Sequence, residues 1–312
     1  MNFKTSLKNV AIIILNYNSA DLTIKAANYL LQFETELQLI IVDNCSKDSS
    51  QQKLELEFTN VKNVHLVFND TNFGYAYGNN IGITYAEKLS NIEFITIMNP
   101  DVIVDAETLG ILREVLQRSK TIGFITAETF YNGRYMTPNE CAWKLPTTGQ
   151  LMIFCTVLGY LCRHFLTRFR FKFNFQNYYE TEHYQDKKLA YVDVVQGCFF
   201  MGKLKTFFEV GKLDENTFLY YEENILGEKV SRIGKKNAVL VGHYIQHNHQ
   251  VKDASLIKRS NKIFDMTCIH NSRDYFIREY FDANSIVKLF LRGFLKLDFC
   301  LRKAVVNITF ND

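Results

Sequence analysis

Three residues, Asn99-Pro100-Asp101, directly follow the apolar run at 94–98 and carry the chemistry that most constrains this chain. The run has the length and composition of a short buried strand, so the asparagine and the aspartate stand where that strand ends. In an open α/β sheet, ligands bind at the carboxyl ends of the strands. A carboxylate there can hold a divalent cation, and the cation can hold a diphosphate. The tripeptide alone is also ordinary turn chemistry, so its position in the chain decides its meaning.

The elements that must position these residues alternate between strand and helix. Continuous apolar runs predict strands at 10–15, 39–42, 64–68 and 94–98. Helices are expected at 21–32, within 46–58, at 75–89 and at 105–117. Strands that alternate with helices of about 12 residues predict right-handed crossovers and a parallel sheet. The alternation then weakens: we expect loop at 130–150, and strands again at 191–195 and 198–201.

A polar cluster follows each of the first four predicted strands, at 16–18, 43–48, 69–80 and 99–101. Any α/β fold has polar loops, so one cluster alone means little. Four clusters rich in Asn and Asp, all at one edge of the sheet, favour a binding site. The glycine pattern of dinucleotide-binding folds is missing after the first run, and no P-loop is present. A diphosphate bridged by a metal ion is therefore the simplest ligand.

The composition of the 312-residue chain is that of a globular protein, with 47% hydrophobic and 22% charged residues. The net charge of +3 is too small to suggest nucleic acid as a partner. The seven cysteines form no Cys-x-x-Cys pair, which predicts free thiols in a reducing cytosol. The first apolar run is too short for a signal peptide, and no stretch of about 18 apolar residues suggests a membrane span.

The motifs at 13–18, 41–50, 72–80 and 98–101, taken in order, resemble the nucleotide-sugar half of family 2 glycosyltransferases, which have the GT-A fold. The resemblance is greatest to bacterial rhamnosyltransferase-like members. It continues through 197–201, 210–215 and 218–223, ends around 247–249, and covers about residues 8–255. The resemblance implies that Asp43 binds the base of a pyrimidine nucleotide. It places around the nucleotide-sugar Asn16, Tyr17, Asn18, Asn44, Asn72, Gly74, Asn80 and Asn99.

The resemblance also implies a divalent metal, Mg²⁺ or Mn²⁺. Asp101 stands where the family's metal-binding Asp-x-Asp ends, and Asn99 replaces the first aspartate. His247 resembles a late metal ligand of the family, with His249 as the competing residue and a purely structural histidine as the alternative. A divalent cation would neutralise the diphosphate that leaves when a sugar is transferred.

Glu222 and Glu223 are the predicted acid–base pair. An acceptor hydroxyl must lose a proton as it attacks the anomeric carbon, and a carboxylate can take that proton. The pair follows an aromatic run at 218–221, where one pKa can be held above its usual value. Glu223 occupies the position of the family's usual base, and Glu222 is its neighbour. The alternative is a solvated helix start, where acids are favoured in any case.

Two segments, 151–176 and 286–297, interleave Lys and Arg with aromatic and aliphatic residues. Both are predicted to be amphipathic helices suited to an anionic membrane surface. The alternatives are helices packed on the core with extended Lys and Arg side chains, and RNA binding through stacked aromatics.

We therefore expect an α/β, GT-A-like (Rossmann-like) fold with a mostly parallel sheet flanked by helices and a C-terminal helical appendage. Residues 1–125 would bind the nucleotide-sugar, 126–260 would form the acceptor and catalytic half, and 261–312 would be the appendage. The expected function is inverting transfer of a sugar from dTDP-rhamnose or a UDP-sugar to a glycan on a lipid carrier, at the inner face of a bacterial cell membrane. The alternatives are a sugar nucleotidyltransferase and a non-catalytic sugar-nucleotide-binding protein.

Overall fold

The computed structural model describes residues 7–33, 36–154, 156–157, 178–184, 186–248 and 258–309. The chain divides into two compact units. The first unit consists of Met1–Lys144, Asn177–Glu215 and Glu222–His249. The second unit consists of Leu145–Gln176, Asn216–Tyr221 and Gln250–Asp312, so the predicted appendage at 261–312 lies within it.

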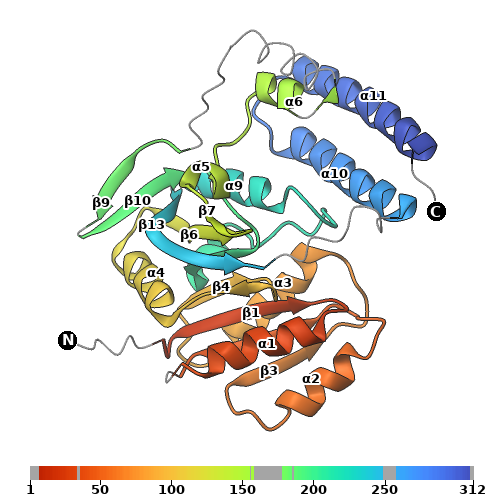
Figure 1. Cartoon of the computed structure of the whole chain (residues 1–312). Coiled ribbons are helices and arrows are strands. Elements are labelled where there is room, and N and C mark those ends of the chain that lie inside the picture. The colour runs from red at the N-terminus through yellow and green to blue at the C-terminus, as the bar shows by residue number, and fades with distance from the viewer. Residues whose placement is uncertain are drawn as a thin grey trace. The chain divides into compact units, whose positions relative to one another are not determined.

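Four parallel strands form the N-terminal half of the sheet in the first unit, in the order β3-β2-β1-β4 (Figure 1). Their bounds are β1 Val10–Asn16, β2 Gln38–Asp43, β3 Val64–Phe68 and β4 Phe94–Met98. All four predicted strands are confirmed. β1, β2 and β4 are nearly continuous runs of buried residues, as suits the inside of a parallel sheet, whereas β3 lies at the edge of the sheet and only its Val64 is buried.

The helices between these strands cover both faces of the sheet (Figure 1). Their bounds are α1 Ala20–Leu31, α2 Ser50–Phe58, α3 Tyr75–Glu87 and α4 Ala106–Arg118. Ile12 and Ile14 pack in the core on one face with α1, while Ile13 packs on the other face with α3. The helix predicted at 105–117 begins one residue later because Asp105 is its N-cap, accepting a 2.6 Å hydrogen bond from the Thr108 N–H.

Beyond β4 the sheet becomes mixed. The path continues through β12 (Phe199–Lys203), β6 (Ile122–Tyr131), β13 (Lys236–His247), β10 (Lys187–Val192) and β9 (Thr181–Tyr184). Strand β12 is antiparallel to both of its neighbours, and only β6 and β13 pair in parallel. The expected parallel arrangement thus holds from β3 to β4 and gives way where the chain no longer alternates strands with crossover helices.

Shorter elements complete the fold, and those at 134–135, 138–141, 142–143 and 148–154 lie wholly or partly within 130–150, which was predicted to be loop. Strand β5 (Val102–Ile103) pairs with β13, β7 (Arg134–Tyr135) pairs with β6, and β8 (Ala142–Trp143) pairs with β11 (Val194–Val195). The helices here are α5 (Pro138–Cys141), α6 (Thr148–Phe154), α8 (Leu204–Glu209) and α9 (Glu222–Arg232). The single strand expected at 191–195 is divided between β10 and β11 at Asp193, whose backbone carbonyl accepts a 2.6 Å hydrogen bond from the Asn237 side chain.

The second unit contains α6, α10 (Arg259–Glu279) and α11 (Ser285–Thr309), which confirms a C-terminal helical region. Of the predicted amphipathic segment at 151–176, all but residues 151–154 and 156–157 lies outside the described residues. None of the helices in the described part of the chain combines the length and the apolar character that crossing a membrane requires. Cys45, Cys141, Cys198, Cys268 and Cys300 are free thiols, as expected.

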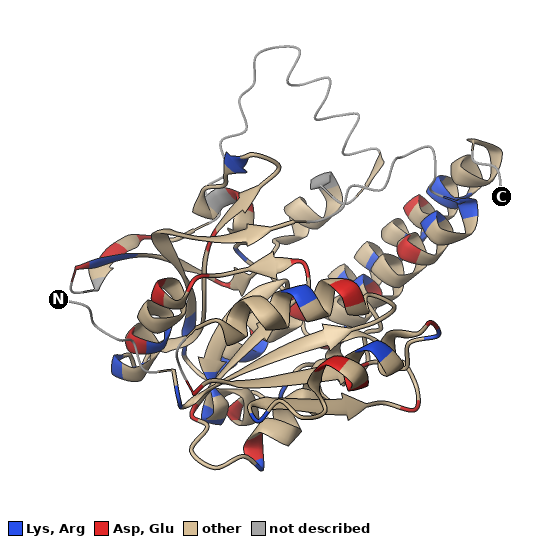
Figure 2. Ribbon diagram, turned by 60° about the horizontal axis from the view of Figure 1, so that its bottom comes forward, with Lys and Arg blue, Asp and Glu red and all other residues tan. Residues whose placement is uncertain are grey.

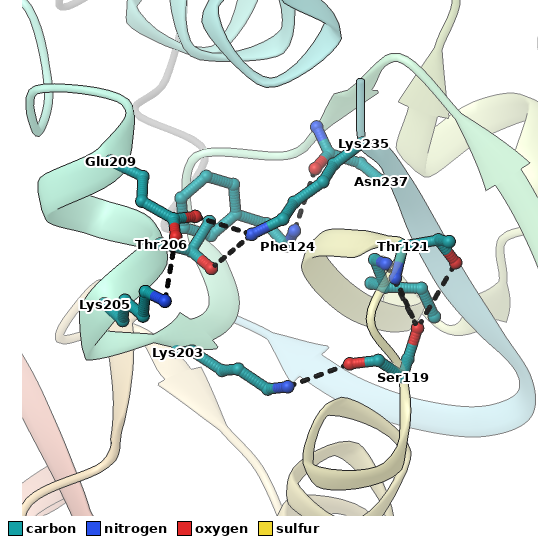
Figure 3. A network of polar contacts seen from close by, with 10 residues as sticks. Ser119, Thr121, Phe124, Lys203, Lys205, Thr206, Glu209, Lys235 and Asn237 are labelled. Atoms are coloured by element: carbon teal, nitrogen blue, oxygen red, sulfur yellow. Dashed lines mark hydrogen bonds and ion pairs between the residues drawn. The ribbon is translucent and has the colours of Figure 1, made fainter. Parts of the chain in front are cut away.

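A polar network closes the amino edge of the sheet, where β4, β6 and β13 begin (Figure 3). Lys203 Nζ donates to the Ser119 carbonyl at 2.8 Å, and Lys235 Nζ donates to Glu209 Oε2 at 2.7 Å. The buried Asn237 side chain accepts a 2.9 Å hydrogen bond from the Phe124 N–H. This edge is therefore held together by contacts between the chain's own cations, carboxylate and carbonyls.

Candidate functional site

The polar residues after β1 and β2 meet at the opposite, carboxyl edge. The Asp43 carboxylate is fully buried. It accepts hydrogen bonds from Asn16 Nδ2 at 2.7 Å, from the Ser46 hydroxyl at 2.6 Å and its N–H at 2.9 Å, and from Gln51 Nε2 at 3.1 Å. Four donors match the acceptor capacity of a carboxylate. Asp43 therefore fixes the loop after β2, and a ligand can reach its oxygens only by replacing one of these donors.

Tyr17 and Asn18 continue this edge after β1. Asn18, with φ of 51°, donates its N–H to Ser46 Oγ at 2.8 Å and accepts from the Lys47 N–H at 2.7 Å. The Tyr17 ring is 46% exposed beside it. An exposed aromatic ring next to a rigid polar loop is a surface on which a nucleobase can stack.

A second group of amides surrounds the start of α3. Asn44 Nδ2 donates to Asn72 Oδ1 at 2.9 Å and to the Gly74 carbonyl at 3.1 Å, and the Gly74 N–H donates to Asn72 Oδ1 at 2.9 Å. Gly74 has φ of 100°, a conformation that side chains disfavour, and it directly precedes the helix. The N–H groups at the start of a 13-residue helix favour an anion.

Asn80 lies apart from this group. Its buried side chain donates to the Leu213 carbonyl at 2.9 Å and to Glu215 Oε1 at 2.8 Å, and it accepts from the Leu213 N–H at 3.1 Å. The structure thus uses Asn80 to hold the 213–215 loop against α3, and does not bring it together with Asn72 and Gly74.

Asp101 and His247 form the candidate metal pair. Asp101 follows β4, and the pairing of β5 with β13 places Val102 opposite His247. His247 Nε2 lies 3.4 Å from Asp101 Oδ2, and both side chains are partly exposed. The Asn248 N–H also donates to the Asp101 carbonyl at 2.8 Å. His249 lies outside the described residues.

This pair suits a cation that arrives with a diphosphate. Within the described ranges, no group of three or more His, Cys, Asp or Glu residues is arranged to hold a metal ion. Mg²⁺ in nucleotide sites takes one or two protein carboxylates and fills its other positions with phosphate oxygens and water. One carboxylate and one imidazole, as here, fit that pattern and would also accept Mn²⁺.

Glu222 and Glu223 begin α9. Glu222 is buried and Glu223 is partly exposed. Burial raises the pKa of the Glu223 carboxyl, and hydrogen bonds from the backbone N–H groups of Glu223 and Gly197 offset part of that rise. A Cβ atom placed on Gly197 would overlap Oε1 of Glu223 and lie 3.0 Å from its Cδ. The carboxylate therefore rests directly on the Gly197 backbone.

The acid pair is connected to the start of α3 and to the turn at 99–101 through three residues, Tyr75, Gly197 and Cys198. These lie within the motifs at 72–80 and 197–201, but the sequence did not identify them as site residues. Tyr75 Oη donates to the Gly197 carbonyl at 2.6 Å, and the Asn99 N–H donates to the Cys198 carbonyl at 2.8 Å. Burial, and then the charges of Glu223 and Glu222, raise the pKa of Tyr75 well above its usual value, so its phenol remains a donor. The sequence signal that could have pointed to Gly197 is its position directly before the apolar residues of β12.

Cys198 lies between the turn at 99–101 and the acid pair. Burial raises the pKa of its thiol, and the negative charges of Asp101 and Glu223 raise it further. Both carboxylates are therefore close enough to Cys198 for their charges to act on it. The carboxyl edge thus brings together Asp101, His247, Glu222 and Glu223 around the backbone of residues 197–198.

Known proteins share this sequence pattern and this fold. The profile of glycosyl transferase family 2 matches residues 11–178. The low-salt glycan biosynthesis hexosyltransferase Agl10 of Haloferax volcanii is 27% identical over 221 residues, which are 70% of this chain and 61% of Agl10. The chain thus spans less than two thirds of the length of that relative.

Two solved structures resemble this fold at low sequence identity. The mannosyltransferase PcManGT of Pyrobaculum calidifontis, solved with GDP-Man and Mn²⁺, has a TM-score of 0.57 at 12% identity, covering 96% of this chain and 73% of its own. GalNAc-T7, solved with UDP, GalNAc and Mn²⁺, has a TM-score of 0.56 at 13% identity, covering 93% and 54%. These similarities concern the fold alone, which is GT-A-like.

Proposed function

The chain belongs to glycosyl transferase family 2, and from this premise we propose that it transfers a sugar from a pyrimidine nucleotide-sugar, dTDP-rhamnose or a UDP-sugar, to a glycan. The observation that carries the proposal is that the turn holding Asp101 and the Glu223 carboxylate contact adjacent residues: the Asn99 N–H donates to the Cys198 carbonyl at 2.8 Å, and Glu223 lies against the Gly197 backbone. A site for a cation and a site for a proton then lie on the same edge of the sheet, as sugar transfer requires.

The donor would lie along the loops after β1, β2 and β3. Tyr17 offers a ring face to the base, and Asp43, held by Asn16 and Ser46, would accept from the N–H group of the base after one of its four present donors is replaced. Asn18 and Asn44 hold the surrounding backbone. Asn72, Gly74 and the start of α3 would line the ribose and the diphosphate, with Asn99 near the ribose or the metal ion. Asn80 would support this region indirectly, by holding the 213–215 loop against α3.

Asp101 and His247 would hold Mg²⁺ or Mn²⁺, with His249 as the alternative to His247. The bound cation would supply positive charge to the leaving diphosphate. The residues' own contribution is to fix the place of that charge, since the Asn99 N–H anchors the turn to the Cys198 carbonyl and the Asn248 N–H anchors it to β13. Pre-set charge of this kind costs no reorganisation during the reaction.

Glu223 would act as the general base. The oxygen of the acceptor hydroxyl forms a bond with the anomeric carbon, the bond from that carbon to the diphosphate oxygen breaks, and the hydroxyl proton passes to Glu223. A single displacement of this kind inverts the configuration at the anomeric carbon. A carboxylate whose pKa is raised by burial is a stronger base than an ordinary glutamate. Glu222, buried beside it, would help to keep that pKa high.

The acceptor would be a growing glycan on a lipid carrier, in the synthesis of a bacterial surface polysaccharide at the inner face of the membrane. The Haloferax relative is named for its part in glycan biosynthesis, and this supports a glycan acceptor. Rhamnose as the donor sugar rests on the order of the sequence motifs.

A donor screen tests this proposal. The full chain is heated with each of dTDP-rhamnose, UDP-glucose, UDP-N-acetylglucosamine and GDP-mannose, with and without Mn²⁺. A ligand at 100 times its Kd stabilises a protein by about 2.7 kcal/mol, which shifts the melting temperature measurably. We expect one pyrimidine nucleotide-sugar to stabilise the chain most, and more strongly with Mn²⁺ than without it. Equal stabilisation by all donors, or by none, would rule the proposal out.

A further inference from the structure

Helix α11 exposes an apolar stripe that the glycosyl transfer site does not use. Seven of its side chains are between 57% and 84% exposed: Ile286, Leu289, Phe290, Leu297, Leu301, Val305 and Ile308. Spacings of three, four, seven and eight residues put them on one face of the helix. At 1.5 Å per residue the stripe is about 33 Å long. A continuous exposed apolar surface of this length marks an interaction site.

The opposite face of α11 is already occupied within the second unit. Leu291, Leu295 and Val306 are buried there. The buried Asp298 accepts a 2.7 Å hydrogen bond from the Val157 N–H and a 2.8 Å hydrogen bond from Arg302 Nε. The helix is therefore fixed to its own unit by one face, and the stripe faces away from those contacts.

The two C-terminal helices, which include the stripe, carry an excess of positive charge. Residues 258–309 contain ten Lys and Arg against five Asp and Glu. Blue and red segments both mark the overlapping helices that lead to the C-terminus in Figure 2. Lys288, Lys296 and Lys303 lie on α11 itself. This distribution complements a surface of negative charge.

The turn between α10 and α11 holds a cavity of about 440 Å³, lined by Arg278, Ala283, Ser285, Lys288, Leu289 and Arg292. Asp274 binds Arg292 through hydrogen bonds of 2.6 and 3.0 Å, and Glu279 pairs with Arg278 at 2.5 Å. Lys288 Nζ donates to the Arg278 carbonyl at 3.1 Å. Asp282 lies in the same turn, so three carboxylates stand against the three cations and the charges around the cavity balance. Leu289 belongs both to this cavity and to the stripe.

We propose that α11 lies in the plane of an anionic phospholipid membrane, with its apolar stripe among the acyl chains and the excess cations of α10 and α11 near the headgroups. This deepens the proposed function and rests on it, because an enzyme whose acceptor is carried by a lipid must work at that surface. A membrane fits the charge better than a second copy of the chain does. A two-fold pairing of the stripes would bring the same cations together, whereas anionic headgroups meet them with opposite charge.

Vesicle sedimentation of the full chain tests the proposal. We expect binding to vesicles of phosphatidylcholine with 30% phosphatidylglycerol, and at least tenfold weaker binding to phosphatidylcholine alone. Raising the salt from 0.1 to 1 M should weaken binding to the anionic vesicles, because the screening length falls from about 10 to about 3 Å. Equal binding to both vesicles, or to neither, would overturn the proposal.

Matched variants identify the surface. Leu297→Ser and Leu301→Ser should each weaken vesicle binding roughly tenfold, because each removes a side chain buried among the acyl chains. Leu56→Ser on α2, where the leucine is 90% exposed, is the control and should bind as the parent does. Lys288→Gln should weaken binding to anionic vesicles only. Unchanged binding in both stripe variants, or loss of a dimer at unchanged vesicle binding, would contradict the proposal.

The same variants separate this proposal from the proposed function. The stripe and the residues of the donor edge lie in different units. Stabilisation by the nucleotide-sugar with Mn²⁺ should therefore stay within about 1 °C of the parent in Leu297→Ser and Leu301→Ser. If vesicles are not bound while the donor still stabilises the chain, only the membrane proposal fails. If no donor stabilises the chain while vesicles are bound, only the proposed function fails.

Discussion

The sheet has a glutamate with a shifted pKa at each of its two edges, and the two pKa values are shifted in opposite directions. At the amino edge, a hydrogen bond from Lys235 to Glu209, 2.7 Å long, lowers the pKa of that carboxyl (Figure 3). At the carboxyl edge, burial raises the pKa of Glu223, and Glu222 and Asp101 lie close to the same backbone. One edge therefore pairs its charges to hold the fold together, while the other gathers acids.

This difference separates a structural carboxylate from a reactive one. A carboxyl with a lowered pKa stays ionised and does not take up a proton near neutral pH, whereas one with a raised pKa can take a proton from a substrate. If this difference holds, removing the carboxylate of Glu223 should change the reaction rate strongly, and removing that of Glu209 should not.

Glu223→Gln should reduce kcat about 10³-fold, because loss of a general base typically costs a factor of 10² to 10⁴. The Kd for the nucleotide-sugar should change less than about twofold, since the donor loops are untouched. Steady-state kinetics give kcat, and calorimetry gives the Kd.

The control is Glu228→Gln, five residues along the same helix, whose carboxylate pairs with Arg232 at 3.0 Å. It should retain the parent kcat. An unchanged kcat in Glu223→Gln would instead support a protein that binds sugar nucleotides without catalysis.

Gly197→Ala should displace the base without removing it. The added Cβ would overlap Glu223 Oε1, the far end of a side chain that can move. A shift of about 1 Å in a reacting group can cost about 10²-fold in rate, so we expect a fall of that order in kcat with an unchanged melting temperature. Gly149→Ala, with no atom within 4 Å of the new Cβ, is the matched control. Parent activity in Gly197→Ala would show that this contact does not position the base.

The pH profile should show the raised pKa directly. The base must be ionised to act, so activity falls as pH drops through the pKa of Glu223 in the folded protein. Because that pKa is raised, the acid limb of kcat should lie above pH 4.5, the ordinary value for glutamate. A limb at or below that value, measured across buffers at constant ionic strength, would mean that Glu223 is not the base or is not buried during turnover.

Glu209→Gln should have the smallest effect. A partly exposed ion pair typically contributes below about 1 kcal/mol to the free energy of unfolding, and kcat should not change. The pKa of Glu209 is lower in the folded protein than in the unfolded chain. The ion pair therefore stabilises the fold fully at pH values above the unfolded-state pKa, and this stabilisation is lost as the pH falls through the folded-state pKa. Urea unfolding at pH 7 and pH 3 should therefore show a difference from the parent that shrinks at the lower pH. A reduced kcat would contradict a purely structural role.

The sequence was sufficient to predict what is local. The strands predicted at 10–15 and 94–98 are continuous apolar runs, and Asp101 stands in the turn after the second, so the element and the residue near its end could be predicted together. The place of β12 between β4 and β6 could not, because a strand pairing reached through about a hundred residues leaves no periodic signal in the sequence.

The contacts that assemble the site are equally long in range. Tyr75 and Gly197 are 122 positions apart, and Asn80 bonds with a residue 133 positions away. All three are polar or small residues near the edge predicted to bind the ligand. Their spacing in the sequence could not distinguish a residue that lines this edge from one that holds a neighbouring loop. Only the folded chain shows that Asn80 holds a loop and that Tyr75 bonds to the Gly197 backbone against which Glu223 lies.

The most direct test of the account is the dependence of nucleotide binding on Mn²⁺ and on Asp101. Calorimetry of UDP and dTDP should show at least tenfold tighter binding with Mn²⁺ in the parent chain and in the control Asp265→Asn, whose aspartate is exposed on α10. Asp101→Asn should lose that gain and keep the binding seen without metal. If Asp101→Asn retains the full effect of Mn²⁺, the cation is held elsewhere and the carboxyl edge does not work as described.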